Sequence, residues 1–177
     1  TLDLADADVV SNISTEIPGI AQKTDVVLHA AGKAHSIPKT EEEKKVFFDV
    51  NYQGTVNLCR GLEKSGIPES FIFISTVAVY GKETGENIAE NEPLNGDTPY
   101  ALRKINAEEF LPEWSKANNG KLKILRPSLI AGTNPPGTLG AMIQGIPTGR
   151  YFNIAGGKSK KSVLMVPDIA NLVSLVS

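Results

Sequence analysis

The sequence predicts an α/β fold, built as a doubly wound parallel sheet with helices on both faces. Short, continuously apolar runs alternate along the chain with longer segments in which apolar residues recur every three or four positions. The runs are apolar throughout rather than at every second position, which is typical of parallel strands buried on both faces. Because such sheets bind ligands outside the carboxyl ends of their strands, we expect the functional residues directly after the apolar runs.

The apolar runs are the predicted strands. The three clearest are followed by turn or polar residues, and two shorter ones lie near the end of the chain. In order, they cover residues 25–30, 71–75, 121–125, 151–154 and 163–166.

The segments with helical periodicity are predicted at residues 41–65, 98–117, 139–146 and 168–176. Gly66 and Pro68 end the first of them. Thr98 is a suitable N-cap for the second, with Pro99 in its first turn. Pro112 lies inside this second helix, where its missing N–H and its ring predict a kink or a break.

Composition and charge exclude several classes of function. The 177 residues carry a net charge of −2 and no basic stripe, so neither nucleic acid nor a membrane surface is an expected partner. No apolar run approaches the roughly 20 residues that a membrane-spanning helix needs. The single cysteine, Cys59, excludes a disulfide framework, and its helical surroundings predict a packing role. These features lead us to expect a cytoplasmic protein.

Tyr100 and Lys104 are the first candidates for catalysis. Their spacing of four residues places both side chains on one face of the predicted helix. A phenol with a pKa near 10 is a poor base at neutral pH, but a nearby ammonium group favours the phenolate and lowers that pKa. Such a pair can exchange a proton with a sugar hydroxyl. On its own, the same spacing also fits a packed tyrosine and a solvated lysine.

The second predicted strand ends in hydroxyl side chains that can complete this pair. Ser75 and Thr76 lead directly into Val79-Tyr80-Gly81. With Tyr100 and Lys104, this order resembles the extended short-chain dehydrogenase/reductase family, in which a Ser or Thr, a Tyr and a Lys form the catalytic set. The resemblance implies a Rossmann-like fold. It also implies that Thr76 is the catalytic hydroxyl and that Ser75 is the second choice.

Other segments resemble the family's motifs in the family's order. They imply cofactor contacts from Asp3 and Leu4, from the small residues Ala30, Ala31 and Gly32, from Asn51 in an Asn-x-x-Gly-Thr signature, from Ser75 and Lys104, and from Pro127 after the sixth strand of the family fold. The implied cofactor is NAD, with NADP left open. The family's Gly-rich pyrophosphate loop has no counterpart here, and Thr1 to Leu4 resembles internal sequence. We therefore expect a fragment that has little activity by itself.

The differences from relatives narrow the expected reaction. The 4,6-dehydratases of the family place Asp and Glu directly after the catalytic Thr, where this chain has Val77 and Ala78. Without those proton carriers, the resemblance implies C4 epimerisation of a UDP-hexose or UDP-N-acetylhexosamine, or else reduction of a 4-keto nucleotide sugar. Thr76 and Tyr100 would contact the sugar. Lys161 occupies the place of an Arg that holds the diphosphate in relatives, and a solvated surface lysine fits it equally well.

The resemblance also implies a division into domains and a partner. The chain would comprise a partial dinucleotide-binding domain, 1–132, and a partial substrate-binding region, 133–177. It would form a homodimer that pairs helices 41–65 and 98–117. No cluster of ligands accompanies His29 or His35, so no metal is expected. Two alternatives remain, a non-catalytic nucleotide-binding member of the fold and an unrelated flavodoxin-like module that would bind flavin.

Overall fold

The structure is a computed structural model that describes residues 3–11, 24–34, 38–135, 137–149 and 160–177. The chain divides into two compact units, the first ending at Arg126 and the second beginning at Pro127. The boundary predicted from the sequence was residue 132. Each unit is described by itself.

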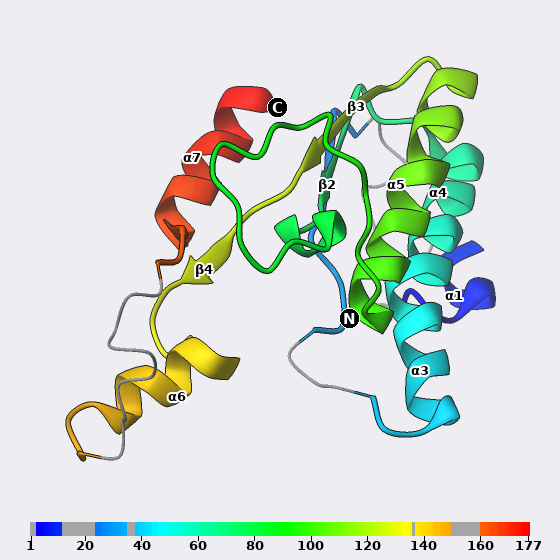
Figure 1. Cartoon of the computed structure of the whole chain (residues 1–177). Coiled ribbons are helices and arrows are strands. Elements are labelled where there is room, and N and C mark those ends of the chain that lie inside the picture. The colour runs from blue at the N-terminus through cyan, green and yellow to red at the C-terminus, as the bar shows by residue number, and fades with distance from the viewer. Residues whose placement is uncertain (1–2, 12–23, 35–37, 136, 150–159) are drawn as a thin grey trace. The chain divides into compact units, whose positions relative to one another are not determined.

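A parallel sheet of three strands forms the centre of the first unit (Figure 1). Strand β1 (Val26–His29) pairs with β2 (Ser70–Ile74), and β2 pairs with β3 (Lys121–Leu125). The register places His29 beside Phe73 and Ile74 beside Leu125, so the carboxyl ends of the strands lie together. The three main strands predicted from the sequence, and their parallel arrangement, are confirmed.

Helices cover one face of this sheet in the described part of the first unit. A continuous helical segment comprises α3 (Glu41–Phe48), a π-helical turn η1 (Asp49–Gln53) and α4 (Gly54–Ser65). Helix α5 (Pro99–Ala117) packs beside it (Figure 1). Their apolar side chains and those of β2 form one core, made of Leu58, Cys59, Leu62, Phe71, Phe73, Ala107, Leu111 and Trp114.

The opposite face of β1 is open in the described residues. Val26 is 37% exposed and Leu28 is 47% exposed, although both are apolar strand residues. The continuously apolar pattern predicted burial on both faces, and that burial needs a further layer on this side. Cys59, in contrast, is fully buried in the core, as expected for a packing residue.

The ends of the helices follow the sequence signals. The Thr98 hydroxyl accepts a hydrogen bond from the backbone N–H of Ala101 and caps α5, with Pro99 in the first turn. Gly66 ends α4 with φ 137°. The expected break at Pro112 does not occur, because α5 runs unbroken to Ala117. Pro112 is exposed, and the buried residues around it hold the helix in place through tertiary packing.

The second unit is smaller. Strands β4 (Leu129–Ala131) and β5 (Val163–Met165) pair in parallel, with Ile130 beside Leu164. Helix α6 spans Gly137–Gly145 and α7 spans Val166–Val176. The strand predicted at 151–154 lies outside the described residues. None of the helices in the described ranges combines the length and the apolar character that crossing a bilayer requires.

Candidate functional site

Lys104 is held at the carboxyl end of β2. Its side chain is almost fully buried, and Nζ donates a hydrogen bond to the carbonyl oxygen of Ile74 over 2.8 Å. The same Nζ lies 4.4 Å from the centre of the Phe73 ring, a cation–π distance. Burial lowers the pKa of Lys104 to about 8, and the Glu108 carboxylate on the next turn of α5 opposes that shift. The amine is thus fixed in position and titrates near neutral pH.

Tyr100 lies one turn earlier on the same helix and is half-buried. Its phenol makes no hydrogen bond to any of the described residues. Burial raises the pKa of Tyr100, a shift opposite in direction to the lowering expected from Lys104. In this structure the lysine charge is directed to the Ile74 carbonyl, and desolvation of the phenol dominates.

The two hydroxyl residues after β2 have different surroundings. The backbone N–H of Ser75 donates to the carbonyl of Leu125 over 2.7 Å, which extends the pairing with β3 by one bond. Its Oγ is buried and has no hydrogen-bond partner among the described residues. Thr76 is half-exposed, and its Oγ1 accepts from the Ala78 N–H at 3.2 Å, capping the short helix η2 (Val77–Tyr80). The hydroxyl hydrogen of Thr76 stays available as a donor.

Close backbone contacts hold η2 against the start of α5. The N–H of Gly96 donates to the carbonyl of Val79 over 2.9 Å. A Cβ on Gly96 would lie 2.6 Å from both the Ala101 Cβ and the Ala78 oxygen, so only glycine fits there. Because Tyr100 precedes Ala101 and Thr76 begins η2, this contact sets the two segments that carry them side by side.

Asn51 forms a two-point clamp on the loop after β1. Its Oδ1 accepts from the backbone N–H of Lys33 at 2.8 Å, and its Nδ2 donates to the carbonyl of the same residue at 3.0 Å. Asn51 is fully buried and lies in the π-helical turn η1. A mid-helix Asn is otherwise unfavourable, so this backbone pairing explains its presence. Turns of this type are frequent at functional sites.

Thr55 and His29 extend the hydrogen bonds of the Asn51 clamp. The Thr55 hydroxyl donates to the Asn51 carbonyl at 3.0 Å, and Thr55 Oγ1 also lies 2.9 Å from Nε2 of His29. Since the one hydroxyl hydrogen is used on Asn51, His29 must donate from Nε2. Burial, and secondarily the charge of Lys104, lowers the pKa of His29 to about 4, so the imidazole is neutral at physiological pH.

The first motif of the chain meets the same helix. The carbonyl of Leu4 accepts a hydrogen bond from Asn57 Nδ2 at 3.0 Å. A Cβ on Gly54 would lie 3.1 Å from the Leu4 Cβ, so the glycine of the Asn-x-x-Gly-Thr signature allows this close approach. Asp3 is exposed, and its Oδ1 accepts from the Ala5 N–H.

The loops after β1 and β2 bring several of the predicted cofactor residues to the same edge of the sheet. The exposed small residues Ala30, Ala31 and Gly32 follow β1 and leave the backbone open to a ligand. A Cβ on Gly32 would lie 3.5 Å from Lys104 Nζ, so this loop and the Lys104 amine are neighbours. Ser75, with its partnerless Oγ, follows β2, the strand next to β1, at the same edge of the sheet. Small residues, a cationic donor and an orphaned hydroxyl suit a ribose and its nicotinamide.

Comparison with known proteins identifies the family of this chain. The sequence profile of the NAD dependent epimerase/dehydratase family matches residues 2–177. The chain belongs to this family. An Escherichia coli O157:H7 relative of the family, N-acetyl-alpha-D-glucosaminyl-diphospho-ditrans,octacis-undecaprenol 4-epimerase, is 35% identical over 150 residues, which are 84% of this chain and 44% of the relative. UDP-glucose 4-epimerase of Vibrio cholerae is 29% identical over 168 residues, 93% of this chain and 50% of the relative.

Similarity to solved structures confirms the Rossmann-like fold of this chain. UDP-glucose 4-epimerase of Thermus thermophilus, solved in complex with NAD, is 26% identical with a TM-score of 0.78, over 98% of this chain and 58% of that chain. RMD from Pseudomonas aeruginosa, complexed with NADPH, is 25% identical with a TM-score of 0.75, over 98% and 59%. The chain spans about half the length of the curated relatives above.

Two predicted residues lie in the second unit. Pro127 is its first residue and is half-buried, and Lys161 is exposed. Their roles stay predictions. Sequence reasoning considered His29 for a metal site, rejected that site, and assigned no role to Arg126. A polar residue at the end of a buried strand was the available signal for His29. Among the described residues no group of His, Cys, Asp and Glu side chains is arranged to hold a metal ion.

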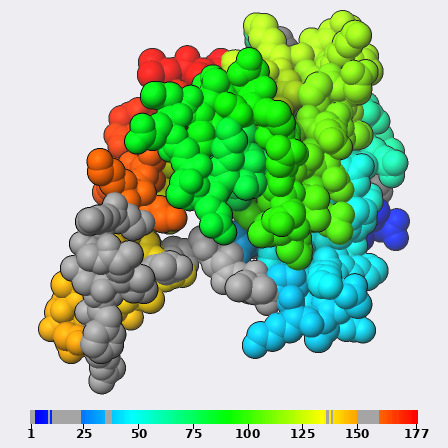
Figure 2. Space-filling view, viewed as in Figure 1, coloured from blue at the N-terminus to red at the C-terminus, as the bar shows by residue number. Residues whose placement is uncertain are grey.

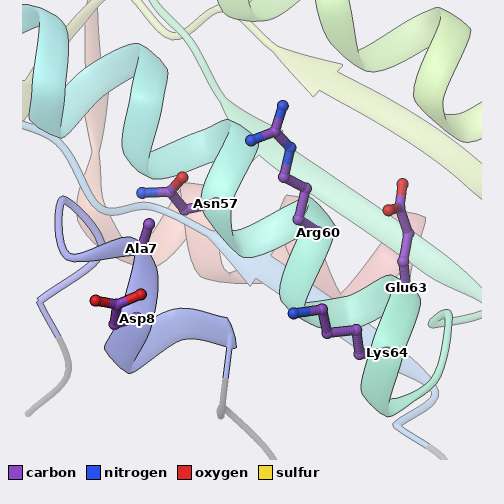
Figure 3. Close-up of a pocket in the computed structure, with 6 residues that line it drawn as sticks. All are labelled: Ala7, Asp8, Asn57, Arg60, Glu63 and Lys64. Carbon is purple, nitrogen blue, oxygen red and sulfur yellow. The ribbon is translucent and has the colours of Figure 1, made fainter.

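A hollow of about 510 Å³ lies elsewhere, between α1 (Ala7–Ser11) and α4 (Figure 3). Its wall is polar and charged on the α4 side, and α1 closes the other side. The lining residues are Ala7, Asp8, Asn57, Arg60, Glu63 and Lys64. None of the predicted catalytic or cofactor residues lines this hollow, so it is separate from the Lys104 site.

Proposed function

We propose that the protein containing this chain is an NAD-dependent 4-epimerase of a sugar linked to a diphosphate, such as a UDP-hexose or UDP-N-acetylhexosamine. The observation that carries the proposal is the anchoring of Lys104 at the Ile74 carbonyl, with Tyr100 one turn away and Thr76 following the same strand. Relatives named as 4-epimerases support it, at 35% and 29% identity.

The dinucleotide, when bound, would accept and return a hydride at the sugar's C4. The chain's own residues would do the rest. Thr76 has a hydroxyl hydrogen to donate to the 4-oxygen and orient it. Tyr100 would take the proton from that oxygen and give it back. Lys104 would hold the nicotinamide ribose and, as a cation, favour the phenolate of Tyr100.

Two side chains argue against dehydration. Eliminating water from the sugar needs a further acid and base next to the catalytic hydroxyl. Val77, which is 43% exposed, and the exposed Ala78 occupy those places, and neither transfers a proton. Reduction of a 4-keto sugar needs no such groups and is the alternative. A relative named as a reductase supports this alternative. It is GDP-6-deoxy-D-mannose reductase of Pseudomonas aeruginosa, which is 28% identical over 127 residues.

The experiment uses the longest natural protein that carries this sequence. UDP-glucose, UDP-N-acetylglucosamine and N-acetylglucosaminyl-diphospho-undecaprenol are each incubated with a trace of NAD, and the C4 configuration is followed by NMR. An epimerase interconverts the C4 epimers without net consumption of cofactor. Stoichiometric oxidation of NAD(P)H by a 4-keto sugar, with no epimer formed, would instead establish the reductase.

A matched pair of tyrosine variants tests the site itself. Tyr100→Phe should abolish turnover, because it removes the proton carrier. Tyr52→Phe removes a phenol whose ring packs on Phe48 and should leave turnover unchanged. If both variants retained activity, the role of Tyr100 would be refuted. If the natural protein bound NADH without any turnover, it would be a non-catalytic nucleotide-binding member of the fold. Binding of flavin instead would indicate a flavodoxin-like module.

We also propose that the protein is a homodimer through the helices at 41–65 and 98–117. Val46 on α3 is 42% exposed and Leu102 on α5 is 40% exposed, so both helices carry apolar side chains at the surface. Sedimentation should show a dimer, and Leu102→Glu should shift it towards monomer. A wild-type protein that sediments as a monomer at high concentration would contradict the proposal.

A further inference from the structure

Arg126, the last residue of the first unit, is engaged by three protein groups at once. Its Nε donates to both carboxylate oxygens of Glu108, at 2.9 and 3.2 Å, and Nη2 donates to the same carboxylate at 2.5 Å. Its Nη1 donates to the Tyr80 phenol oxygen at 2.9 Å and to the Glu90 carbonyl at 2.7 Å. The guanidinium carbon also lies 5.1 Å from the Tyr80 ring centre.

Arg126 and its three partners come from four separate segments. Arg126 follows β3, Glu108 is on α5, Tyr80 ends η2, and Glu90 belongs to the segment 81–97 that leads into α5. In Figure 2, the green atoms of that segment pack directly against the yellow-green atoms of α5. We call the four residues together the Arg126 clamp. It ties the segment 81–97 to the helix that carries Tyr100 and Lys104.

Burial of the Glu108–Arg126 ion pair makes substitution of Arg126 unfavourable. The Glu108 side chain is only 2% exposed and the Arg126 side chain 19%. A buried carboxylate without its partner is strongly unfavourable, and the planar guanidinium satisfies it with parallel bonds that a lysine cannot make. Hydrogen bonds that Arg126 donates to Glu108 raise the pKa of Arg126 above its ordinary value, so the charge is permanent. With its Nε and both terminal nitrogens already donating to protein acceptors, Arg126 is poorly placed to hold a substrate diphosphate.

The Arg126 clamp contacts both segments that carry the predicted catalytic residues. Glu108 lies one turn from Lys104 on α5, and its charge opposes the lowering of the Lys104 pKa. Tyr80 ends the short helix that Thr76 begins. Tyr80 and Val79 pack with Ile105 of α5 in a small core of their own. A shift of Tyr80 would therefore move Thr76 relative to Tyr100.

We propose that Arg126 is a positioning residue that, through Glu108, Tyr80 and the Glu90 carbonyl, fixes the Thr76 segment against α5 and thereby sets the turnover rate of bound substrate. This inference rests on the proposed epimerase or reductase function. It differs from a role in binding the diphosphate, which would act on substrate affinity.

Kinetics of two variants separate these roles. Tyr80→Phe keeps the ring in its core and removes only the oxygen that Arg126 bonds. Arg126→Lys keeps the charge but cannot serve all three partners. We expect kcat to fall on the order of tenfold or more in both, since small misplacements of catalytic groups can cost about a hundredfold, with KM nearly unchanged. A rise in KM for Arg126→Lys, with Tyr80→Phe like wild type, would overturn the proposal in favour of diphosphate binding.

A control and a second measurement keep the test independent of any activity. Lys82→Gln removes the Lys82–Glu92 ion pair, which lies in the same segment outside the clamp, and should leave kcat unchanged. Hydrogen–deuterium exchange of the peptide 82–97 should quicken in Tyr80→Phe and not in Lys82→Gln. Faster exchange in a protein with no turnover would leave the clamp standing and refute the proposed function. Unchanged exchange and unchanged kcat in Tyr80→Phe would refute the clamp alone.

Discussion

A methyl group on Gly32 would lie 2.8 Å from Oδ1 of Asn51, inside the contact distance of the two atoms. That oxygen is already bonded to the Lys33 N–H at 2.8 Å, and the rest of the Asn51 side chain is buried. The absence of a side chain at residue 32 therefore keeps the loop after β1 in its clamped position, next to the Lys104 amine.

Gly32→Ala should break the Asn51 clamp. We expect the free energy of unfolding to fall by about 1–3 kcal/mol, the cost of leaving a buried polar group without its partner. NADH titration of the longest natural protein, followed by fluorescence, should show weaker binding. Gly120→Ala is the matched control, since its Cβ would meet nothing closer than 3.6 Å. Equal NADH affinity in the two variants would show that the Asn51 clamp does not shape the predicted cofactor loop after β1.

Gly81→Ala should destabilise the fold through steric contact as well as backbone conformation. Gly81 has φ 66°, and a Cβ there would lie 2.3 Å from the Asn95 carbonyl oxygen. Gly66 has φ 137° with no atom near its Cβ position, so Gly66→Ala isolates the conformational cost, about 1–3 kcal/mol. Urea unfolding should show a larger loss for Gly81→Ala. A loss of unfolding free energy no larger than that of Gly66→Ala would mean that the 81–97 segment shifts at little cost to relieve the contact.

His29 should make stability depend on pH in the acid range. Its pKa is about 4 in the folded protein against 6.5 ordinarily, so between these values the unfolded chain binds a proton that the folded chain does not. Stability therefore falls as the pH drops from about 6.5 to 4, by roughly 3 kcal/mol at 1.36 kcal/mol per pKa unit. His29→Gln can still donate to Thr55 but does not titrate. Its urea midpoint should vary less over this range, and an identical slope in both proteins would contradict the assignment.

The Lys104 amine should react as a group with a pKa of about 8. Competitive acetylation with mass spectrometry should show half-maximal reactivity of this residue near that pH, because burial favours the neutral amine. Glu108→Gln should lower the midpoint further, since the Glu108 charge opposes the shift. A midpoint near the ordinary 10.5 in the wild-type protein would show that Lys104 is more solvated than its contacts indicate.

The strands and long helices were predictable because burial imposes a pattern on consecutive residues. Helix 41–65 was predicted from its apolar spacing, but the π-helical turn at Asp49–Gln53 was not, because it depends on the pairing of Asn51 with a loop far away in the chain. Strand β4 was missed because three residues after Pro127 carry too little pattern. The sequence predicted a kink or a break at Pro112, and the break does not occur, since core packing on both sides outweighs the local cost.

The sequence predicted the segments at the candidate site better than it predicted their contacts. The structure holds the segments that carry Tyr100, Lys104 and Thr76 next to one another, and the roles of these three residues stay predictions. The Arg126 clamp could not be foreseen, because its partners Glu108, Tyr80 and Glu90 come from distant parts of the chain. Their spacing in the sequence does not predict that they are in contact. The contacts depend on how α5 packs near the ends of β2 and β3.

The π-helical turn also sets how α3 and α4 face the rest of the unit. A π-helical turn holds one residue more than an α-helical turn, so making 49–53 regular α-helix at the same chain length would rotate α3 relative to α4 by about 100°. Phe47, buried on one side of the turn, and Leu58, buried on the other, could then no longer both be buried. A substitution that improves the local helix would therefore misalign the segments around it, whereas deleting one residue from 49–53 would leave the two helices in phase.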